Sequence, residues 1–172
     1  MGSAYDVPNE APPGPLRLVQ QFVNSLDLEN DAEWLDHAWF AEHGIAGDEE
    51  LETAREAREA LRALLSANNG GPLEPQAIEK LNGISADVGL AIRFEKPGRT
   101  VLEPKDARPL STILVAVHTA MGDASWSRLK ACRNCRWAFF DFSKNRSATW
   151  CSMRLCGNRL KTRAYRRRRH GD

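Results

Sequence analysis

Four cysteines in the C-terminal part of the chain are the residues whose type and spacing point most directly to chemistry. They are the only cysteines among 172 residues, and they follow the pattern Cys132-x2-Cys135-x15-Cys151-x4-Cys156. A Cys-x2-Cys pair folds into a tight turn that directs both sulfur atoms to one point, and a second pair about 15–20 residues later completes a tetrahedral set. The pattern predicts one structural Zn²⁺ per chain, held by all four cysteines.

Two alternatives to zinc stay open from the cysteines alone. Iron also accepts four thiolate ligands. The same residues could form disulfides or a redox pair, although the first residues resemble no secretory signal, which favours a metal. With either metal, four protein ligands leave no coordination position for water, so the site is expected to support folding and not catalysis.

Charge is distributed very unevenly around this predicted site. Residues 128–172 contain 14 Lys and Arg and two acidic residues, a formal charge of +12, whereas residues 1–127 contain 10 basic and 21 acidic residues, a formal charge of −11. Such an asymmetry indicates a polyanionic partner for the C-terminal part. A solubilising tail would explain Arg166–Arg169 alone, but beside a metal module these arginines are expected to follow phosphate groups.

The basic residues of the C-terminal part form two candidate groups. After Cys156, the spacing of Leu160 and Ala164 predicts a short helix with a basic side. Arginine suits this role because its planar group can form two parallel hydrogen bonds with a phosphate or a guanine edge. A polar loop between the cysteine pairs supplies the second group. The predicted contacts with nucleic acid are Lys144, Arg146, Arg159, Lys161, Arg163, Arg166, Arg167, Arg168 and Arg169.

Aromatic residues are dense between the two cysteine pairs. Trp137, Phe139, Phe140 and Trp150 are expected to form the small core of the metal module, because a module of this size has few other ways to bury apolar surface. The alternative is that one aromatic ring stays exposed and stacks on a base.

Several short motifs carry a family resemblance. Cys156-Gly157-Asn158-Arg159, with Trp150-Cys151-Ser152-Met153 before it, resembles the CGNR zinc finger. Phe22-Val23-Asn24-Ser25 and Asp31-x-x-Trp34-Leu35 resemble the N-terminal ABATE domain, the domain of a stress-induced transcription regulator. The resemblance implies a bacterial, cytoplasmic and nucleoid-associated regulator, with the finger as DNA reader and the N-terminal domain as sensor or dimerisation domain.

The remaining sequence predicts the elements that position the site. Residues 1–15 are expected to form a flexible lead-in, residues 16–123 an acidic domain that folds on its own, and residues 126–172 the finger with its basic C-terminal helix. Apolar residues at helical spacing predict helices over 16–26, 34–39, 48–67, 76–84 and 110–121.

A hairpin is predicted from residues 87–94 and 99–102, around the turn residues Lys96-Pro97-Gly98. Leu90, Ile92 and Phe94 alternate as in a half-buried strand. The predicted fold class is therefore α+β: a mainly helical N-terminal domain with a small hairpin, plus a zinc module with four cysteine ligands.

The sequence favours a binding protein over an enzyme. His37, His43 and His118 do not pair at metal-binding intervals, and no phosphate loop or nucleophile elbow is present. Asn24 lies within an apolar helical face, where it either satisfies a backbone group or lines a small ligand pocket that Trp34 could border.

Three kinds of partner stay open for the finger. DNA is the leading one, structured RNA or a ribosome is the alternative, and a third is a protein-interaction role for the zinc module. A small-molecule ligand of the N-terminal domain and a homodimer also stay open. No apolar run approaches the length of a membrane span, so no membrane partner is predicted.

Overall fold

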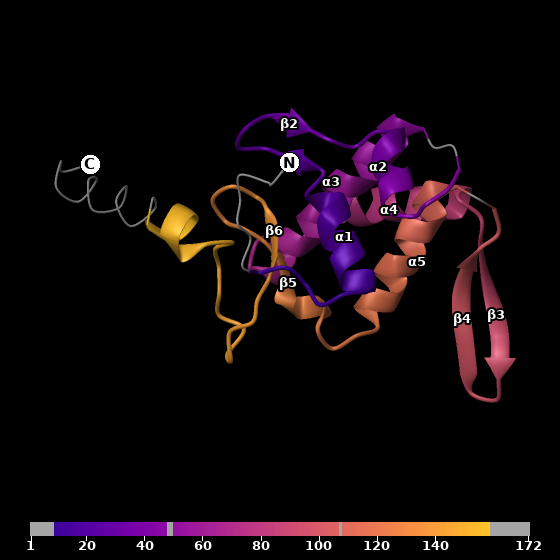
Figure 1. The fold of residues 1–172 in the computed structure, drawn as a ribbon. Coiled ribbons are helices and arrows are strands. Elements are labelled where there is room, and N and C mark those ends of the chain that lie inside the picture. The colour runs from indigo at the N-terminus through magenta and orange to yellow at the C-terminus, as the bar shows by residue number, and fades with distance from the viewer. Residues whose placement is uncertain (1–8, 48–49, 107, 159–172) are drawn as a thin grey trace.

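The computed structural model describes residues 9–47, 50–106 and 108–158. In this part of the chain, five α-helices and three two-stranded antiparallel sheets form an α+β fold, which confirms the predicted fold class. Helices α1, α3 and α5 lie at the centre, with strands β5 and β6 at one side and the β3–β4 hairpin at the other (Figure 1). The predicted basic C-terminal helix falls outside the described residues.

The helices form where apolar residues recur at helical intervals. Their bounds are α1 Pro15–Val23, α2 His37–Glu42, α3 Leu51–Asn68, α4 Pro75–Asp87 and α5 Pro109–Met121. Proline begins α1, α4 and α5, where its missing N–H leaves no intrahelical bond unmade. The side chains that these helices bury most completely include Val19, Phe22, Leu61, Leu65, Leu110 and Ile113.

Two helix boundaries differ from those predicted. The first helix ends at Val23, and Leu26 instead begins strand β1 (Leu26–Asp27), which pairs with β2 (Ala32–Glu33). The second begins at His37, because the side chain of Asp36 accepts a hydrogen bond of 2.8 Å from the backbone N of Trp39 and caps the helix there. Residue 48, the predicted start of the third helix, lies outside the described residues.

Helix α3 ends at the glycine pair that the sequence places after it. Gly70 has a φ of 79°, in the left-handed region that favours glycine, and the N–H of Gly71 returns to the carbonyl of Ser66 at 2.9 Å. This turn leaves Asn68 and Asn69 at the very end of the helix, facing the C-terminal region.

The hairpin of β5 (Leu129–Ala131) and β6 (Ala138–Phe140) belongs to two cores at once. Leu129, Ala131, Ala138 and Phe140 pack with the helices in the main core, whereas Phe139 packs with the four cysteines. The register explains the division, because Leu129 pairs with Phe140 and Lys130 with Phe139, and neighbouring pairs project to opposite faces of a hairpin. The hairpin is therefore a wall shared by the helical core and the metal module.

This shared wall changes one expectation, since Phe140 belongs to the helical core and not to the core of the finger. The independent folding of residues 16–123 stays a prediction, and the helical core includes side chains from residues 129–140. Residues 126–128 form a short 3-10 turn that leads into β5 at Leu129.

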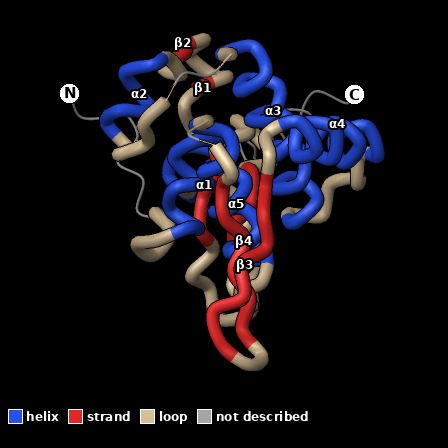
Figure 2. Tube along the Cα trace, turned by 90° about the vertical axis from the view of Figure 1, so that its right-hand side faces the viewer, coloured by secondary structure: helices blue, strands red, loops and turns tan. Residues whose placement is uncertain are grey.

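The hairpin of β3 (Leu90–Lys96) and β4 (Arg99–Pro104) projects beyond the helices as an arm (Figure 2). Its base contacts the core through Leu90, and β4 lies against α5. The expectation of a half-buried strand is therefore wrong for the outer part of the arm: Ile92 is 66% exposed and Phe94 is 81% exposed. The alternation of apolar residues exists, but no described element covers that face.

Candidate metal centre

The four cysteines come together in one buried cluster. Cys132 follows β5, Cys135 lies in the turn before β6, and Cys151 and Cys156 follow in the next loop and turn. Their Sγ atoms all lie within 4.8 Å of one another, with distances of 3.6 Å from Cys135 to Cys151 and 3.5 Å from Cys135 to Cys156. Zn–S bonds of about 2.3 Å in a tetrahedron require sulfur separations of about 3.8 Å, so this donor set fits one Zn²⁺.

Local backbone geometry directs each cysteine pair. In the first turn, the N–H of Arg136 donates to the carbonyl of Cys132 at 3.0 Å, and Arg136 adopts a φ of 66° that reverses the chain. In the second, the side chain of Ser152 accepts from the N–H of Leu155 at 3.3 Å and begins the turn Met153–Gly157. A side chain at Gly157 would meet Met153 Sδ at 2.8 Å, so Met153 would have to move to admit one.

Hydrogen bonds among the crowded thiols shift the pKa of three of them. Hydrogen bonds from Cys135 and Cys151 lower the pKa of the Cys132 thiol. The hydrogen bond to Cys132 raises the pKa of Cys135 to about 12, and hydrogen bonds to Cys132 and Cys135 also raise the pKa of Cys151. A first thiolate thus opposes the ionisation of its neighbours, and a divalent cation at the centre would offset that repulsion.

A small apolar shell surrounds the cysteines. Trp137 and Phe139 are buried against them, and Trp150 and Ala148 pack at the edge. Three of the four aromatic residues predicted for this core are therefore in it. Phe142 is the exposed aromatic residue of the segment, at 58%, and its ring contacts that of Phe140 edge-on at 4.7 Å.

A buried ion pair holds the loop that carries Lys144 and Arg146. Lys130 Nζ donates to Asp141 Oδ2 at 2.7 Å, and the side chains are 6% and 0% exposed. Lys130 also donates to the carbonyl of Arg146 at 2.6 Å, while Asp141 accepts from the N–H of Ser143 at 2.9 Å. These bonds fix both ends of the loop, and the side chains of Lys144 and Arg146 are exposed.

The other basic residues of the described finger fall into two groups, those that bond to the protein itself and those that are exposed. Arg128 donates to the carbonyls of Asp141 and Ser143, Arg133 to the carbonyl of Asn69, and Arg136 to Ser66 Oγ. These three arginines and Lys130 therefore stabilise the fold. Arg154 is exposed, together with the two loop residues. Arg159, Lys161, Arg163 and Arg166–Arg169 lie outside the described residues.

Amide side chains of the helices bind the backbone of the finger. Asn24 accepts from the N–H of Ala138 at 2.7 Å and donates to its carbonyl at 2.9 Å. Gln20 donates to the same carbonyl at 3.1 Å. Asn68 donates to the carbonyl of Leu129 and Asn69 to that of Ala131, at 2.9 and 2.8 Å.

These contacts bear on the two residues proposed for a ligand pocket. Both polar atoms of Asn24 are engaged with Ala138, which fits the backbone-satisfying alternative. Trp34 is 47% exposed and its ring meets that of Trp137 edge-on at 6.4 Å. Neither residue lines the hollow between α1 and α5, whose lining includes Leu18, Gln21, Val115 and Ala116.

Arg62 links helix α1 to the metal module, and the sequence alone did not identify this role. Its side chain is 2% exposed and donates to the carbonyls of Val23 at 2.6 Å and Arg136 at 3.0 Å, which joins the end of α1 to the cysteine turn. Glu59 accepts from its Nε at 2.9 Å. Arg62 falls in an otherwise ordinary charged stretch of α3, so only its position on the buried side of the helix could have identified it.

Comparisons with known families give two matches. The model of the ABATE family, described as "Putative stress-induced transcription regulator", matches residues 16–126, and that of the CGNR zinc finger matches residues 128–169. No curated protein matches the chain. Among the described residues, no helix is both long and apolar enough to span a membrane.

Proposed function

Because the chain belongs to the ABATE family and carries a CGNR zinc finger, we propose that it is a transcription regulator that binds DNA through the finger. The boundary between residues 123 and 126 then divides two roles within one packed unit. Residues 16–123 act as the sensor or dimerisation part, and residues 126–172 contact the nucleic acid. The protein is then cytoplasmic and nucleoid-associated. The metal has a structural role, since four thiolates leave no position for water.

The loop between the cysteine pairs is the main support for this proposal. The ion pair of Lys130 and Asp141 ties the loop to the metal module, and Lys144 and Arg146 are exposed on it, with Arg146 donating to Ser127 Oγ at 3.0 Å. A rigid loop lowers the conformational entropy that is lost when a cationic side chain on it binds a phosphate. The seven cations at 159–169 continue the same basic segment, whereas residues 1–127 have a formal charge of −11 and would repel a polyanion.

Structured RNA is the second candidate partner, and Phe142 is the residue that favours it. Its ring is 58% exposed beside the basic loop, and an exposed aromatic ring can stack on an unpaired base. Duplex DNA offers few unpaired bases. A dominant contribution of Phe142 to affinity would therefore point to RNA.

A salt titration of binding tests the proposal. Four to six phosphate contacts should make log K fall against log salt with a slope of about −3.5 to −5.5 on duplex DNA. Replacing Arg166–Arg169 with alanine should flatten this slope by several units and weaken all sequences alike, and Lys144→Ala with Arg146→Ala should flatten it further.

A matched control and a competition complete the experiment. Lys80→Ala with Lys105→Ala removes two cations outside the finger and should leave the slope unchanged. Competition between duplex DNA and structured RNA, repeated with Phe142→Ala, separates the two candidate partners. Absence of binding at low salt, or a slope insensitive to the arginine replacement, contradicts the proposal.

A further inference from the structure

One face of the β3–β4 arm carries ion pairs between arginine and glutamate side chains. Arg93 contacts Glu103 at 2.6 Å and Glu95 at 3.1 Å, and Arg99 contacts Glu95 at 2.8 Å. These exposed contacts add little stability, but they suit a surface that stays in water.

The opposite face of the arm is apolar. Ile92 pairs with Leu102 and Phe94 with Thr100, and paired residues project to the same face of a hairpin. Leu90 begins this face inside the core, and Ile92 and Phe94 continue it beyond the helices, at 66% and 81% exposed. No charged side chain of the paired positions interrupts the face from Leu90 to Phe94.

The apolar face of the arm would be more stable if another surface covered it. A two-stranded hairpin is marginally stable in water without a partner for its apolar face. Within residues 9–47, 50–106 and 108–158, no element covers the outer part of this face (Figures 1 and 2).

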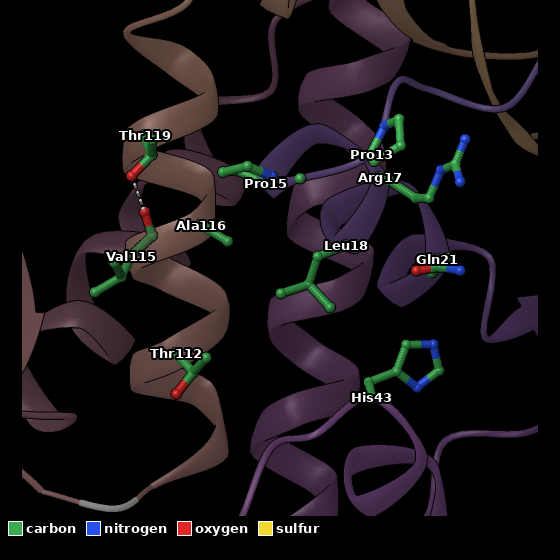
Figure 3. Close-up of a pocket in the computed structure, with 11 residues that line it drawn as sticks. Pro13, Pro15, Arg17, Leu18, Gln21, His43, Thr112, Val115, Ala116 and Thr119 are labelled. Carbon is green, nitrogen blue, oxygen red and sulfur yellow. Dashed lines mark hydrogen bonds between the residues drawn. The ribbon is translucent and has the colours of Figure 1, made fainter.

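A hollow between α1 and α5 offers a surface of matching character. It has a volume of about 500 Å³, and its apolar lining residues include Leu18, Val115 and Ala116 (Figure 3). Two of the polar groups at its rim are already engaged: Arg17 donates to the carbonyl of Ala11 at 2.8 Å, and His43 Nδ1 contacts the carbonyl of Trp39 at 2.7 Å. Polar groups with partners of their own favour an apolar occupant over a polar small molecule.

We propose that two copies of this chain form a dimer by arm exchange, in which the apolar face of each β3–β4 arm lies in the α1–α5 hollow of the other copy. The inference stands on the arm and the hollow and does not depend on nucleic-acid binding. It assigns the dimerisation role of the N-terminal part to a specific surface.

The size of the contact favours a second copy. Residues 1–127 carry a formal charge of −11, which opposes the association of two copies, so their contact has to lie on an uncharged face such as that of the arm. One arm face with an aromatic and several aliphatic side chains would contribute roughly 400 Å². Two arms in two hollows would bury roughly 1,600 Å² in total, the size of a standard stable interface. In Figure 1 the arm lies on the side opposite β5 and β6, so the exchange leaves the finger free.

Sedimentation of the full chain tests the dimer in the absence of nucleic acid. At micromolar concentration the protein should sediment with twice the 19.2 kDa mass of one chain. Phe94→Asp and Val115→Glu should each give monomers, because each places a carboxylate in the contact. Two matched variants should remain dimeric: Arg93→Gln on the ion-paired face of the arm, and His118→Glu on an exposed position of α5.

Mixing the two monomeric variants tests the exchange itself. The Phe94→Asp copy keeps an intact hollow and the Val115→Glu copy keeps an intact arm, so the mixture should associate more strongly than either variant alone. Circular dichroism melts show whether both variants remain folded.

Four results would overturn the proposal: a monomeric wild-type protein, a dimer that survives Phe94→Asp, a dimer that survives Val115→Glu, or a mixture that associates no better than its components. Because no nucleic acid is present, these results leave the DNA-binding proposal untouched. Conversely, a dimer that fails to bind DNA leaves this inference intact.

Discussion

At the scale of single residues, the finger uses basic side chains for two separate purposes. Lys130 is buried and forms three hydrogen bonds around Asp141, whereas Lys144 is exposed in the loop that these bonds shape. A buried ion pair gains little net stability over an apolar pair, but removal of one partner leaves an uncompensated charge. The pair therefore acts mainly by specifying the loop conformation.

The titration of Asp141 should appear in the pH dependence of stability. Burial alone would raise the pKa of Asp141, but hydrogen bonds from Lys130 and Ser143 outweigh it and hold the pKa below its usual range. A carboxyl with a depressed pKa in the folded state stabilises the protein above the unfolded pKa of about 3.9. This stabilisation is lost as the pH falls through the folded pKa. We expect Asp141→Asn to lower the free energy of unfolding near neutral pH.

Urea denaturation from pH 7 down to pH 3 measures this effect as a difference between wild type and Asp141→Asn. The difference should shrink as the solution is acidified below about pH 4, because the carboxyl is then protonated in the unfolded chain and, at lower pH, in the folded protein as well. Asp87→Asn is a suitable control, since Asp87 is exposed at the end of α4. A difference that stays constant over the whole range would contradict a charged Asp141.

At the scale of elements, helix α3 connects the helical core to the metal module. Arg62 in its middle contacts the end of α1 and the first cysteine turn, and Asn68 and Asn69 at its end bind β5. Helix α3 also supplies Leu61 and Leu65 to the core. The same element thus supports the core and sets the position of the finger.

Replacing Arg62 should disturb both regions at once. Arg62→Ala removes the donors that satisfy the carbonyls of Val23 and Arg136, and it should lower the free energy of unfolding by about 3–5 kcal/mol. Arg55→Ala on the same helix, where the side chain is 37% exposed, should cost less than about 1 kcal/mol. Urea denaturation of the three proteins gives both values, and similar losses for the two variants would show that Arg62 is not the connecting residue.

At the scale of the whole molecule, the two family regions share one folded unit. The β5–β6 hairpin places Leu129 and Phe140 in the helical core and Phe139 beside the cysteines. Because zinc binding stabilises the conformation that its ligands require, metal binding should also stabilise the helices through this hairpin.

Truncation and metal removal test this coupling. A chain that ends at Asp123 lacks the four core side chains of β5 and β6, so we expect it to lose a cooperative thermal transition in circular dichroism. A chain that ends at Asn158 retains every described contact and should keep the transition. Chelation of zinc from the full chain should lower the melting temperature of the helical signal. A cooperative melt of the chain ending at Asp123 would instead establish an independent helical domain.

Local spacing in the sequence was enough to determine the metal centre, the helices and the charge asymmetry. The cysteine pattern, the repeat of apolar residues in α3 and the count of basic residues all depend on neighbours along the chain, so they can be recognised without knowledge of the fold. The same reasoning predicted the turn between β3 and β4.

Only the tertiary structure decided how these parts join. Asn24 binds Ala138 across 114 positions and Arg62 binds Arg136 across 74, and no local pattern identifies such pairs. Burial likewise depends on what packs nearby: the alternating residues of β3 are exposed because the arm extends past the core, and Lys130 is internal because Asp141 folds over it. The periodicity of a segment determines which side is apolar, whereas contacts between distant segments determine what, if anything, covers that side.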